Sequence, residues 1–492
     1  MSARRPRARS LAAAACLSAL APFLACDRDA PGTAELASPD VAVDPDVPFE
    51  AWVGPPCGNG LRDPGEACDG DARPCAALGA FQGDGSAFAP CRDDCKGWDV
   101  SACPWPVRDP REYEVVKPAQ RAAAPVAGAL CNDGTPFAFR IRPSPTRSRD
   151  WVVSLRGGGF CEDRAVPCIR SENLYTTTPL LDRQATIPED EAGGILDPDP
   201  ADNPDFFDAN LVFAWYCTSD FWAGTRTDPI PTLMAPEDGW RFQGRVNVAA
   251  MLDTLIAAYG LADEPGVRVL FNGTSSGAFG ASATADLVAS RLPVAASEGR
   301  VKVLLDSGWL VHDWDETDSR VMMSEEGDAS VMRYAYDFFR ARVNPACEAA
   351  RTGAGGHPGD CLFGRWFVSG LVDPPPAGLG LRLLVVQSLM DTVFAEYHNH
   401  LDSDLAFLQR YGARQLADVL LADPGPDGVP GQPLKASWFL AWQPGHDVIR
   451  DTGAWRVGDP GSTLPDVIHR FWQDGAAQRV VFDPRAGAGR TQ

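Results

Sequence analysis

The strongest fold signal in the sequence is Val267-Arg-Val-Leu-Phe-Asn-Gly273-Thr-Ser275-Ser276-Gly277-Ala-Phe-Gly280. β-favouring residues run up to Asn272, and residues 278–292 are rich in Ala, Leu and Val at helical spacing. The G-x-S-x-G motif between them is typical of a nucleophilic serine on a tight strand-to-helix turn, where side chains at the glycine positions would collide with the strand and helix. The motif predicts Ser275 as a nucleophile at a helix N-terminus, whose dipole stabilises developing negative charge.

An earlier glycine-rich turn could supply the hydrogen-bond donors that such a nucleophile needs. The stretch is Trp151-Val-Val-Ser-Leu-Arg-Gly157-Gly158-Gly159-Phe160, an apolar strand followed by three glycines whose backbone can approach a ligand closely. At a serine turn of this kind the tetrahedral oxyanion is bound by the N–H of the residue after the nucleophile and by an N–H from an earlier loop. Ser276 and the glycine turn are the corresponding groups.

A base and an acid that orients it should follow the serine in the chain. His446 lies in a Gln-Pro-Gly-His loop after the strand-like residues 436–442 and is the candidate base. Asp391 and Asp306 each end a buried strand-like run. The residues alone favour Asp391 only slightly, so Asp306 stays the rival acid.

The other histidines suggest no further site. His398 and His400 form a His-Asn-His pair that is compatible with a metal ion, but surface histidines are the favoured interpretation because no third ligand is apparent. His469 lies in an apolar run of helical period, residues 464–472, and is predicted to pack in the core. We therefore predict neither a metal nor a cofactor.

The N-terminus is predicted to direct export. Residues 1–25 combine four arginines with an apolar core that is short for a transmembrane helix, which is typical of a signal peptide. They end in Phe-Leu-Ala before Cys26, which resembles a lipobox, so Cys26 is a candidate lipidation site and membrane anchor. Ordinary cleavage nearby, with secretion, is the alternative. The acidic, proline-rich residues 26–56 are predicted to be a disordered tether.

Six cysteines within residues 57–103 predict a small disulfide-rich module, because this segment has few large apolar side chains. Their pairing cannot be chosen from sequence, since six cysteines allow 15 connectivities. The opening Cys57-Gly-Asn-Gly…Pro-Gly-Glu66-Ala-Cys68-Asp69 resembles a short cysteine-rich repeat of exported bacterial proteins. Less favoured alternatives are zinc at Cys91-x3-Cys95 and calcium at Asp63, Glu66, Asp69 and Asp71.

Composition and charge exclude several classes of protein. The chain of 492 residues has 45% hydrophobic and 22% charged residues, which is ordinary for a globular protein. It carries 66 acidic against 44 basic residues, a formal charge of −22, so binding driven by neutralising nucleic-acid phosphates is not expected. Residues 117–490 hold enough apolar sequence for one large domain.

Several ordered motifs resemble the pectin acetylesterase/Notum family of α/β-hydrolase serine esterases, over about 350 residues from Cys131 to Trp472. They are Leu155-Arg-Gly-Gly-Gly-Phe-Cys161, Trp215-Tyr-Cys217-Thr-Ser-Asp220-Phe-Trp222, Phe242-Gln-Gly244-Arg245, the Ser275 turn, Leu305-Asp306-Ser-Gly-Trp309, Gln387-Ser-Leu-Met-Asp391 and His446. The resemblance implies a mostly parallel sheet flanked by helices, here preceded by the disulfide-rich module.

The resemblance also implies roles for single residues. Ser275 would be the nucleophile, His446 the base and Asp391 the orienting acid, with Asp306 structural. The implied oxyanion donors are Gly158, Gly159 and Ser276. The implied disulfides are Cys161–Cys168 and Cys131–Cys217, which leave Cys347 and Cys361 as a third pair. The chain departs from the family at Gly159, where an aromatic residue is usual, and at Ser276, where alanine is more common.

We therefore expect an exported serine carboxylesterase, lipid-anchored in the cell envelope or secreted, and monomeric. The favoured substrate is an acetylated polysaccharide, as in the pectin acetylesterases. The alternatives are a longer acyl chain on a protein or lipid, and a non-catalytic cell-surface binding protein on a hydrolase fold. Residues 223–240 are either part of a lid over the acyl site or a plain surface loop.

Overall fold

The computed structural model describes residues 57–59, 62, 66–78, 87–103, 112–118, 128–161, 192–232, 235–312, 314, 327–398, 400–401, 403–451, 455–484 and 490–491. The predicted signal peptide, the tether with Cys26, and Cys168 lie outside these residues. The described residues all belong to one compact unit, Pro55–Gln492. Among them, no helix combines the length and the apolar character needed to cross a bilayer.

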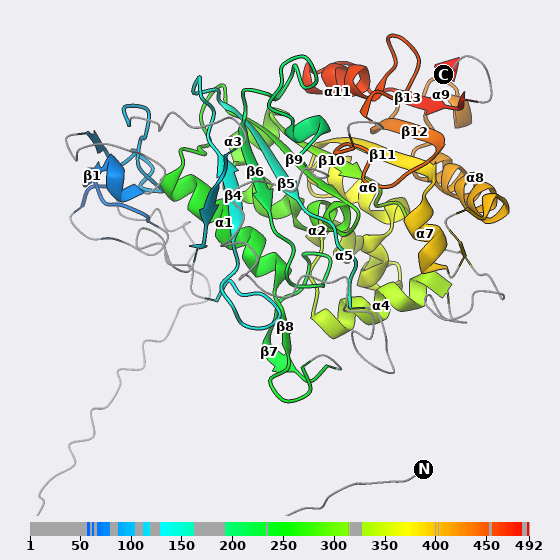
Figure 1. The fold of residues 1–492 in the computed structure, drawn as a ribbon, viewed down its shortest axis with the longest axis horizontal. Helices are drawn as coiled ribbons and strands as arrows, with labels where there is room; N and C mark the ends of the chain where they lie inside the picture. Colours follow the sequence, from blue (N-terminus) through cyan, green and yellow to red (C-terminus); the bar gives the residue numbers. More distant parts are fainter. Residues whose placement is uncertain are drawn as a thin grey trace, which may run out of the picture. The chain divides into compact units, whose positions relative to one another are not determined.

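A ten-stranded sheet forms the centre of the described chain. Its strands are β3 (Glu114–Val116), β4 (Phe139–Arg142), β5 (Asp150–Leu155), β6 (Asn210–Ala214), β9 (Arg268–Thr274), β10 (Val301–Asp306), β11 (Arg382–Met390), β12 (Ser437–Pro444), β13 (Arg479–Phe482) and β14 (Arg490–Thr491). They lie in the order β14-β13-β12-β11-β10-β9-β5-β6-β4-β3 (Figure 1). Strands β13 to β6 in this order are parallel, and β14, β4 and β3 pair antiparallel.

Helices connect and flank these strands. They are α1 (Gly244–Ala258), α2 (Ser276–Arg291), α3 (Pro293–Ser297), α4 (Gly327–Phe339), α5 (Pro345–Gly353), α6 (Gly364–Val372), α7 (Thr392–Tyr397), α8 (Leu405–Ala422), α9 (Gly425–Gly428) and α11 (Leu464–Trp472), with short 3-10 helices η1 (Cys75–Leu78), η6 (Gly194–Leu196) and η7 (Pro358–Leu362). Helix α2 packs on β5, β9 and β10, and α6 and α8 pack on β11. The predicted mostly parallel sheet flanked by helices is confirmed.

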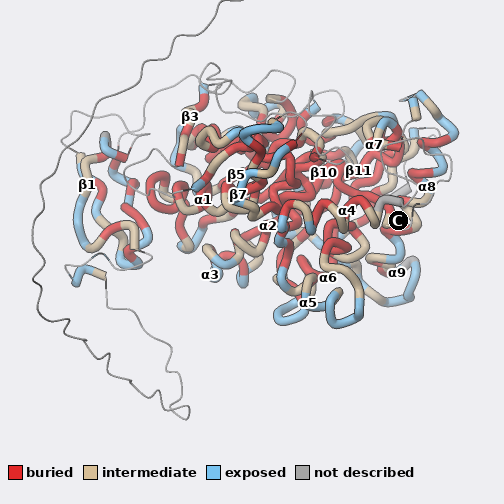
Figure 2. Tube along the Cα trace, turned by 90° about the horizontal axis from the view of Figure 1, so that it is seen from below, coloured by how far each residue is buried: buried red, intermediate tan, exposed pale blue. Residues whose placement is uncertain are grey.

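Burial explains why the apolar runs become central strands. Strands β10 and β11 are buried along almost their whole length, as is usual for parallel strands covered on both faces. Figure 2 shows buried residues concentrated in the sheet and α2, with exposed residues around α5. The predicted strand before Ser275 and the predicted helix after it are β9 and α2. Since β9, β10, β11 and β12 are parallel neighbours, their carboxyl ends meet at one edge of the sheet.

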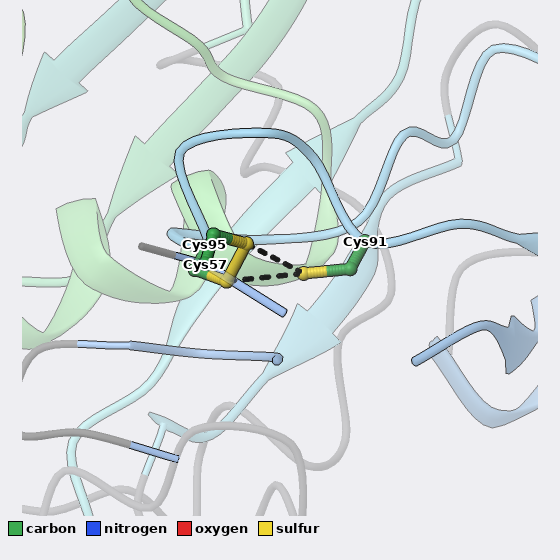
Figure 3. Close-up of side chains that lie close together, drawn as sticks. All are labelled: Cys57, Cys91 and Cys95. Carbon is green, nitrogen blue, oxygen red and sulfur yellow. Dashed lines mark hydrogen bonds between the residues drawn. A yellow bond between two sulfur atoms is a disulfide. The ribbon is translucent and has the colours of Figure 1, made fainter. Parts of the chain in front are cut away.

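The disulfide-rich module contains β1 (Arg73–Pro74) paired with β2 (Phe88–Ala89). Its disulfides are Cys57–Cys95, Cys68–Cys91 and Cys75–Cys103. Figure 3 shows Cys91 beside the Cys57–Cys95 bridge, with its Sγ 3.7 Å from that of Cys95. All six sulfurs are therefore in disulfides, which leaves no thiolate for the zinc alternative.

The acidic side chains considered for calcium have protein partners. Asp69 accepts a hydrogen bond of 2.7 Å from the Gly58 N–H, and Asp71 lies 3.8 Å from Arg62. Asp63 lies outside the described residues. Oxygens of Glu66 and Asp69 lie within 4.8 Å of each other, so calcium binding at these carboxylates stays a prediction.

The module contacts the sheet domain. The Arg92 guanidinium donates to the Ile256 carbonyl, and the Arg147 guanidinium donates to the Cys103 carbonyl at 3.1 Å. A Cβ on Gly97 would lie 2.5 Å from the Ile256 oxygen, so only glycine permits this approach.

The segment 223–240 contains β7 (Arg226–Ile230), which pairs with β8 (Trp240–Phe242). The middle of β7 is exposed. Its Arg226 Nε donates to the Phe338 carbonyl at 2.7 Å, which attaches the hairpin to the end of α4. A lid function for this hairpin stays a prediction.

Candidate active site

Ser275 lies between β9 and α2 in a strained backbone conformation, with φ 55° and ψ −126°. Its N–H donates to the Asp306 carbonyl at 2.8 Å, which ties the turn to the end of β10. A Cβ on Gly273 would collide with the Gly277 carbonyl, and a Cβ on Gly277 would collide with the Leu155 carbonyl. The two glycines are therefore required for this turn, as the motif predicts.

The glycine turn after β5 lies directly against the serine. A Cβ on Gly157 would be 2.7 Å from the Cβ of Ser275. Gly158 and Gly159 have φ values of 141° and 70°, which favour glycine. The Ser276 hydroxyl donates to the Gly159 carbonyl at 2.7 Å. Ser276 occupies the position where alanine is more common in the family, and its hydroxyl fixes the turn that carries the predicted oxyanion donors. Sequence analysis did not predict this contact.

His446 is held by Asp391. The His446 Nδ1 lies 2.9 and 2.8 Å from the two Asp391 oxygens. An ionised carboxylate can only accept, so Nδ1 carries the proton. Asp391 also caps α7, accepting from the Val393 and Phe394 N–H groups, and receives a bond from the Gln387 amide at 3.2 Å. These contacts fix the tautomer and orientation of the imidazole.

Hydrogen bonds join the His446 loop to the end of β10 and to the residue before Ser275. The Asp447 N–H donates to the Ser307 hydroxyl at 3.1 Å, and the Ile449 N–H donates to the buried Asp306 carboxylate at 2.9 Å. Arg450 donates to the Thr274 hydroxyl. His446 and Ser275 are therefore presented by the same edge of the sheet.

The electrostatics of the site favour an imidazolium. Burial lowers the pKa of His446, but the carboxylates of Asp391, Asp447 and Asp306 more than offset this and raise it to about 9. Burial, reinforced by the charge of Asp447, raises the pKa of Asp306 to about 7.

The two candidate acids, Asp391 and Asp306, have different hydrogen-bond partners. Asp391 bonds to the His446 ring, whereas the Asp306 carboxylate accepts from the Ile449 N–H and from the Ser307 hydroxyl at 3.0 Å. Asp306 therefore supports the loop behind the serine. The local sequence favours Asp391 only slightly, because each aspartate ends a buried strand, and it is the family resemblance that implies Asp391 as the orienting acid.

Three histidines depart from expectation. His398 was predicted at the surface but is buried, and burial lowers its pKa to about 4. His400 is partly buried and lies 2.9 Å from Asp404. His469 was predicted in the core, yet its side chain is 57% exposed and pairs with Asp205 at 2.8 Å. The helical period is real in α11, but it places His469 on the outer face.

An aromatic cluster adjoins the glycine turn. The Phe160 ring lies 4.2 Å from that of Phe221, and Phe221 lies 5.0 Å from Phe279, which is one helical turn after Ser275. All three side chains are buried. Phe394 brings a fourth ring to within 6.0 Å of His446.

Disulfides brace the same domain. Cys131 pairs with Cys217, and Cys347 pairs with Cys361. Cys161, at the end of the glycine turn, is also disulfide-bonded, while Cys168 lies outside the described residues. Five disulfides lie wholly within the described residues. Together they indicate a protein that matures in an oxidising compartment.

Comparison with protein families identifies the domain. The pectinacetylesterase family pattern matches residues 112–369, which is more than half of the chain. The chain belongs to the pectinacetylesterase family. The family match begins just after the disulfide-rich module and includes the Ser275 turn, which agrees with the resemblance drawn from the motifs.

Relatives similar to this chain include several Notum proteins. Palmitoleoyl-protein carboxylesterase NOTUM of Drosophila melanogaster is 32% identical over 210 residues, covering 42% of this chain and 30% of the relative. Palmitoleoyl-protein carboxylesterase notum1' of Xenopus laevis is 28% identical over 352 residues, covering 69% of this chain and 64% of the relative. The chain thus spans less than two thirds of the length of these curated relatives.

A solved structure supports the fold. The Wnt deacylase Notum from Drosophila superposes with a TM-score of 0.59 at 23% identity, covering 76% of this chain and 97% of the other. The shared architecture is that of an α/β-hydrolase.

Proposed function

We propose that this protein is a serine carboxylesterase. The observation that carries the proposal is the Asp391–His446 pair, held by a loop that is hydrogen-bonded to the end of β10 and to Thr274, the residue before the strained Ser275. Pectinacetylesterase membership and the names of the Notum relatives support the same chemistry.

In the proposed reaction Ser275 Oγ attacks the ester carbonyl while His446 Nε2 takes its proton. The N–H groups of Ser276, Gly158 and Gly159 would stabilise the oxyanion. The imidazolium then returns the proton to the departing alcohol, which leaves an acyl-enzyme. A water molecule gives its proton to Nε2, attacks the acyl carbonyl and releases the acid as the proton passes back to Ser275.

We propose a short acyl group, with acetylated polysaccharide as the favoured substrate class. Three packed rings, Phe160, Phe221 and Phe279, occupy the space beside the glycine turn and the first turn of α2. Rings packed against one another beside the nucleophile would leave more room for acetate than for a long chain. The palmitoleoyl-protein carboxylesterase names of the relatives favour the longer-chain alternative.

A series of p-nitrophenyl esters from acetate to palmitate tests both the activity and the acyl length. We expect kcat/KM to be highest for acetate and to fall at least about tenfold by butyrate. A maximum at octanoate or longer would overturn the short-chain proposal and support the Notum-like alternative. No hydrolysis of any ester by correctly folded, disulfide-bonded protein would favour a non-catalytic binding protein.

We further propose that the protein is exported and anchored by lipidation of Cys26, with the acidic residues 27–56 as a tether. Fractionation of expressing cells tests the anchor. The wild-type protein should be found with membranes, and Cys26→Ser should move it to the soluble exported fraction. Unchanged membrane association of Cys26→Ser would reject the lipid anchor, leaving the esterase proposal unaffected.

A further inference from the structure

Two buried polar atoms of the His446 loop face each other without a hydrogen bond. His446 Nε2 and Asp447 Oδ1 are 3.6 Å apart. Both atoms are buried, and neither has a hydrogen-bond partner among the described residues. Nε2 is the atom that must accept the Ser275 proton in the proposed reaction, so a carboxylate at this position bears directly on the base.

The Asp447 side chain is fixed rather than free to swing away. Its Oδ2 receives a bond of 3.1 Å from Arg450, which also donates to Thr274, the residue before the serine. The Asp447 N–H is held by the Ser307 hydroxyl at 3.1 Å. The backbone of Asp447 has a φ of 56°, an uncommon conformation for a residue other than glycine. The surrounding loop therefore imposes the position of the carboxylate.

The charges around the His446 ring come from the ends of two strands, β10 and β11, and from the His446 loop itself. Asp391 follows β11 and bonds to Nδ1, Asp306 ends β10, and Asp447 faces Nε2. Arg450 is the cation paired with Asp447, and the uncharged Phe394 ring of α7 covers another side of the imidazole. Three carboxylates and one guanidinium therefore lie around the imidazole, and their net negative charge favours its protonated form.

We propose that Asp447 is a second carboxylate partner of His446, a positioning residue that holds the imidazolium from the Nε2 side in the free enzyme and sets the pH range of catalysis. In this state Nδ1–H faces Asp391 and Nε2–H faces Asp447. The base becomes competent only when the Nε2 proton leaves and the ring can accept from Ser275. The inference rests on the proposed esterase function, because it assigns Nε2 the role of base.

The negative charge of Asp447 determines how kcat/KM should depend on pH. The pKa of His446 is raised to about 9 in the presence of Asp447 and the other two carboxylates. The kcat/KM of the wild-type protein should therefore rise with pH through a midpoint near 9. Removing the negative charge at Asp447 disfavours the imidazolium, so the midpoint should move to lower pH.

Asp447→Asn is the most suitable variant. Asparagine tolerates a positive φ, and its amide oxygen can still accept from Arg450. We expect the midpoint for p-nitrophenyl acetate to move down by about 1 pH unit or more, which raises kcat/KM about tenfold near pH 7. Glu396→Gln, which removes an exposed carboxylate on α7, is the matched control and should leave the midpoint unchanged.

A second readout separates this inference from the esterase proposal. The His446 imidazole can be titrated by NMR with ¹³C-labelled histidine, using His446→Gln to assign the signal, and this needs no turnover. A lower titration midpoint in Asp447→Asn supports the inference even if no ester is hydrolysed, in which case only the esterase proposal fails. Equal midpoints for wild type and Asp447→Asn would overturn the inference. If Asp447→Asn does not fold, Asp447→Gly is measured in its place, since glycine also accepts this φ.

Discussion

Ser275→Ala should lower kcat/KM for p-nitrophenyl acetate by about 10⁴- to 10⁶-fold. The alanine keeps the backbone turn but removes the only atom proposed to form the acyl bond. His446, Asp391 and the glycine turn would still bind and polarise an ester, so a small residual rate above that in water is expected. Covalent labelling by a fluorophosphonate probe should disappear together with activity, because the probe reacts with the activated hydroxyl.

Ser282→Ala is the matched control for this change. Ser282 lies on the same helix, is also buried, and donates only to the Phe279 carbonyl at 2.8 Å. It should retain wild-type labelling and a kcat/KM within about threefold of wild type, since a lost hydrogen bond of this kind affects stability rather than chemistry. If Ser275→Ala kept its activity and its labelling, the nucleophile would have to be another residue and the proposed mechanism would fail.

The Ser275 turn could be predicted from sequence because its determinants are local. The strand, the turn and the helix follow one another within about 25 residues, and steric exclusion at Gly273 and Gly277 acts between adjacent segments. The glycine turn after β5 was equally visible as an apolar run ending in three glycines. What sequence could not show is that the Ser276 hydroxyl bonds to Gly159, because that contact joins residues 117 positions apart.

The surroundings of His446 were harder to predict for the same reason. Asp306 and Asp391 each end a buried strand, and β10 and β11 are adjacent and parallel, so both carboxylates lie at the same sheet edge. The residues alone distinguish them poorly, and their hydrogen-bond partners differ. Asp447 follows the histidine directly in sequence. Its orientation depends on Arg450 and Ser307, and on a positive φ that no local pattern indicated. His398 was predicted to be exposed, but it is buried because it packs against α8 residues such as Tyr411. The local sequence around His398 does not reveal this contact.

Asp391→Asn should lower kcat for p-nitrophenyl acetate by about 10⁴-fold. The Asp391 carboxylate accepts from Nδ1 and leaves Nε2 able to accept the Ser275 proton. An amide at this position can instead donate to Nδ1, which places the ring proton on Nε2 and removes the base. The capping of α7 should survive, since the amide oxygen can still accept from the Val393 N–H.

Asp306→Asn is the control that separates the two acids. Burial and Asp447 raise the pKa of Asp306 from 3.8 to about 7, so the folded protein holds a proton that the unfolded chain releases at lower pH. This contribution to stability is fully present below about pH 4 and is lost as the pH rises through about 7. Asp306→Asn should therefore weaken the fall of Tm over that range while keeping kcat within about tenfold of wild type. A loss of kcat in Asp306→Asn that equals or exceeds the loss in Asp391→Asn would assign the orienting role to Asp306 instead.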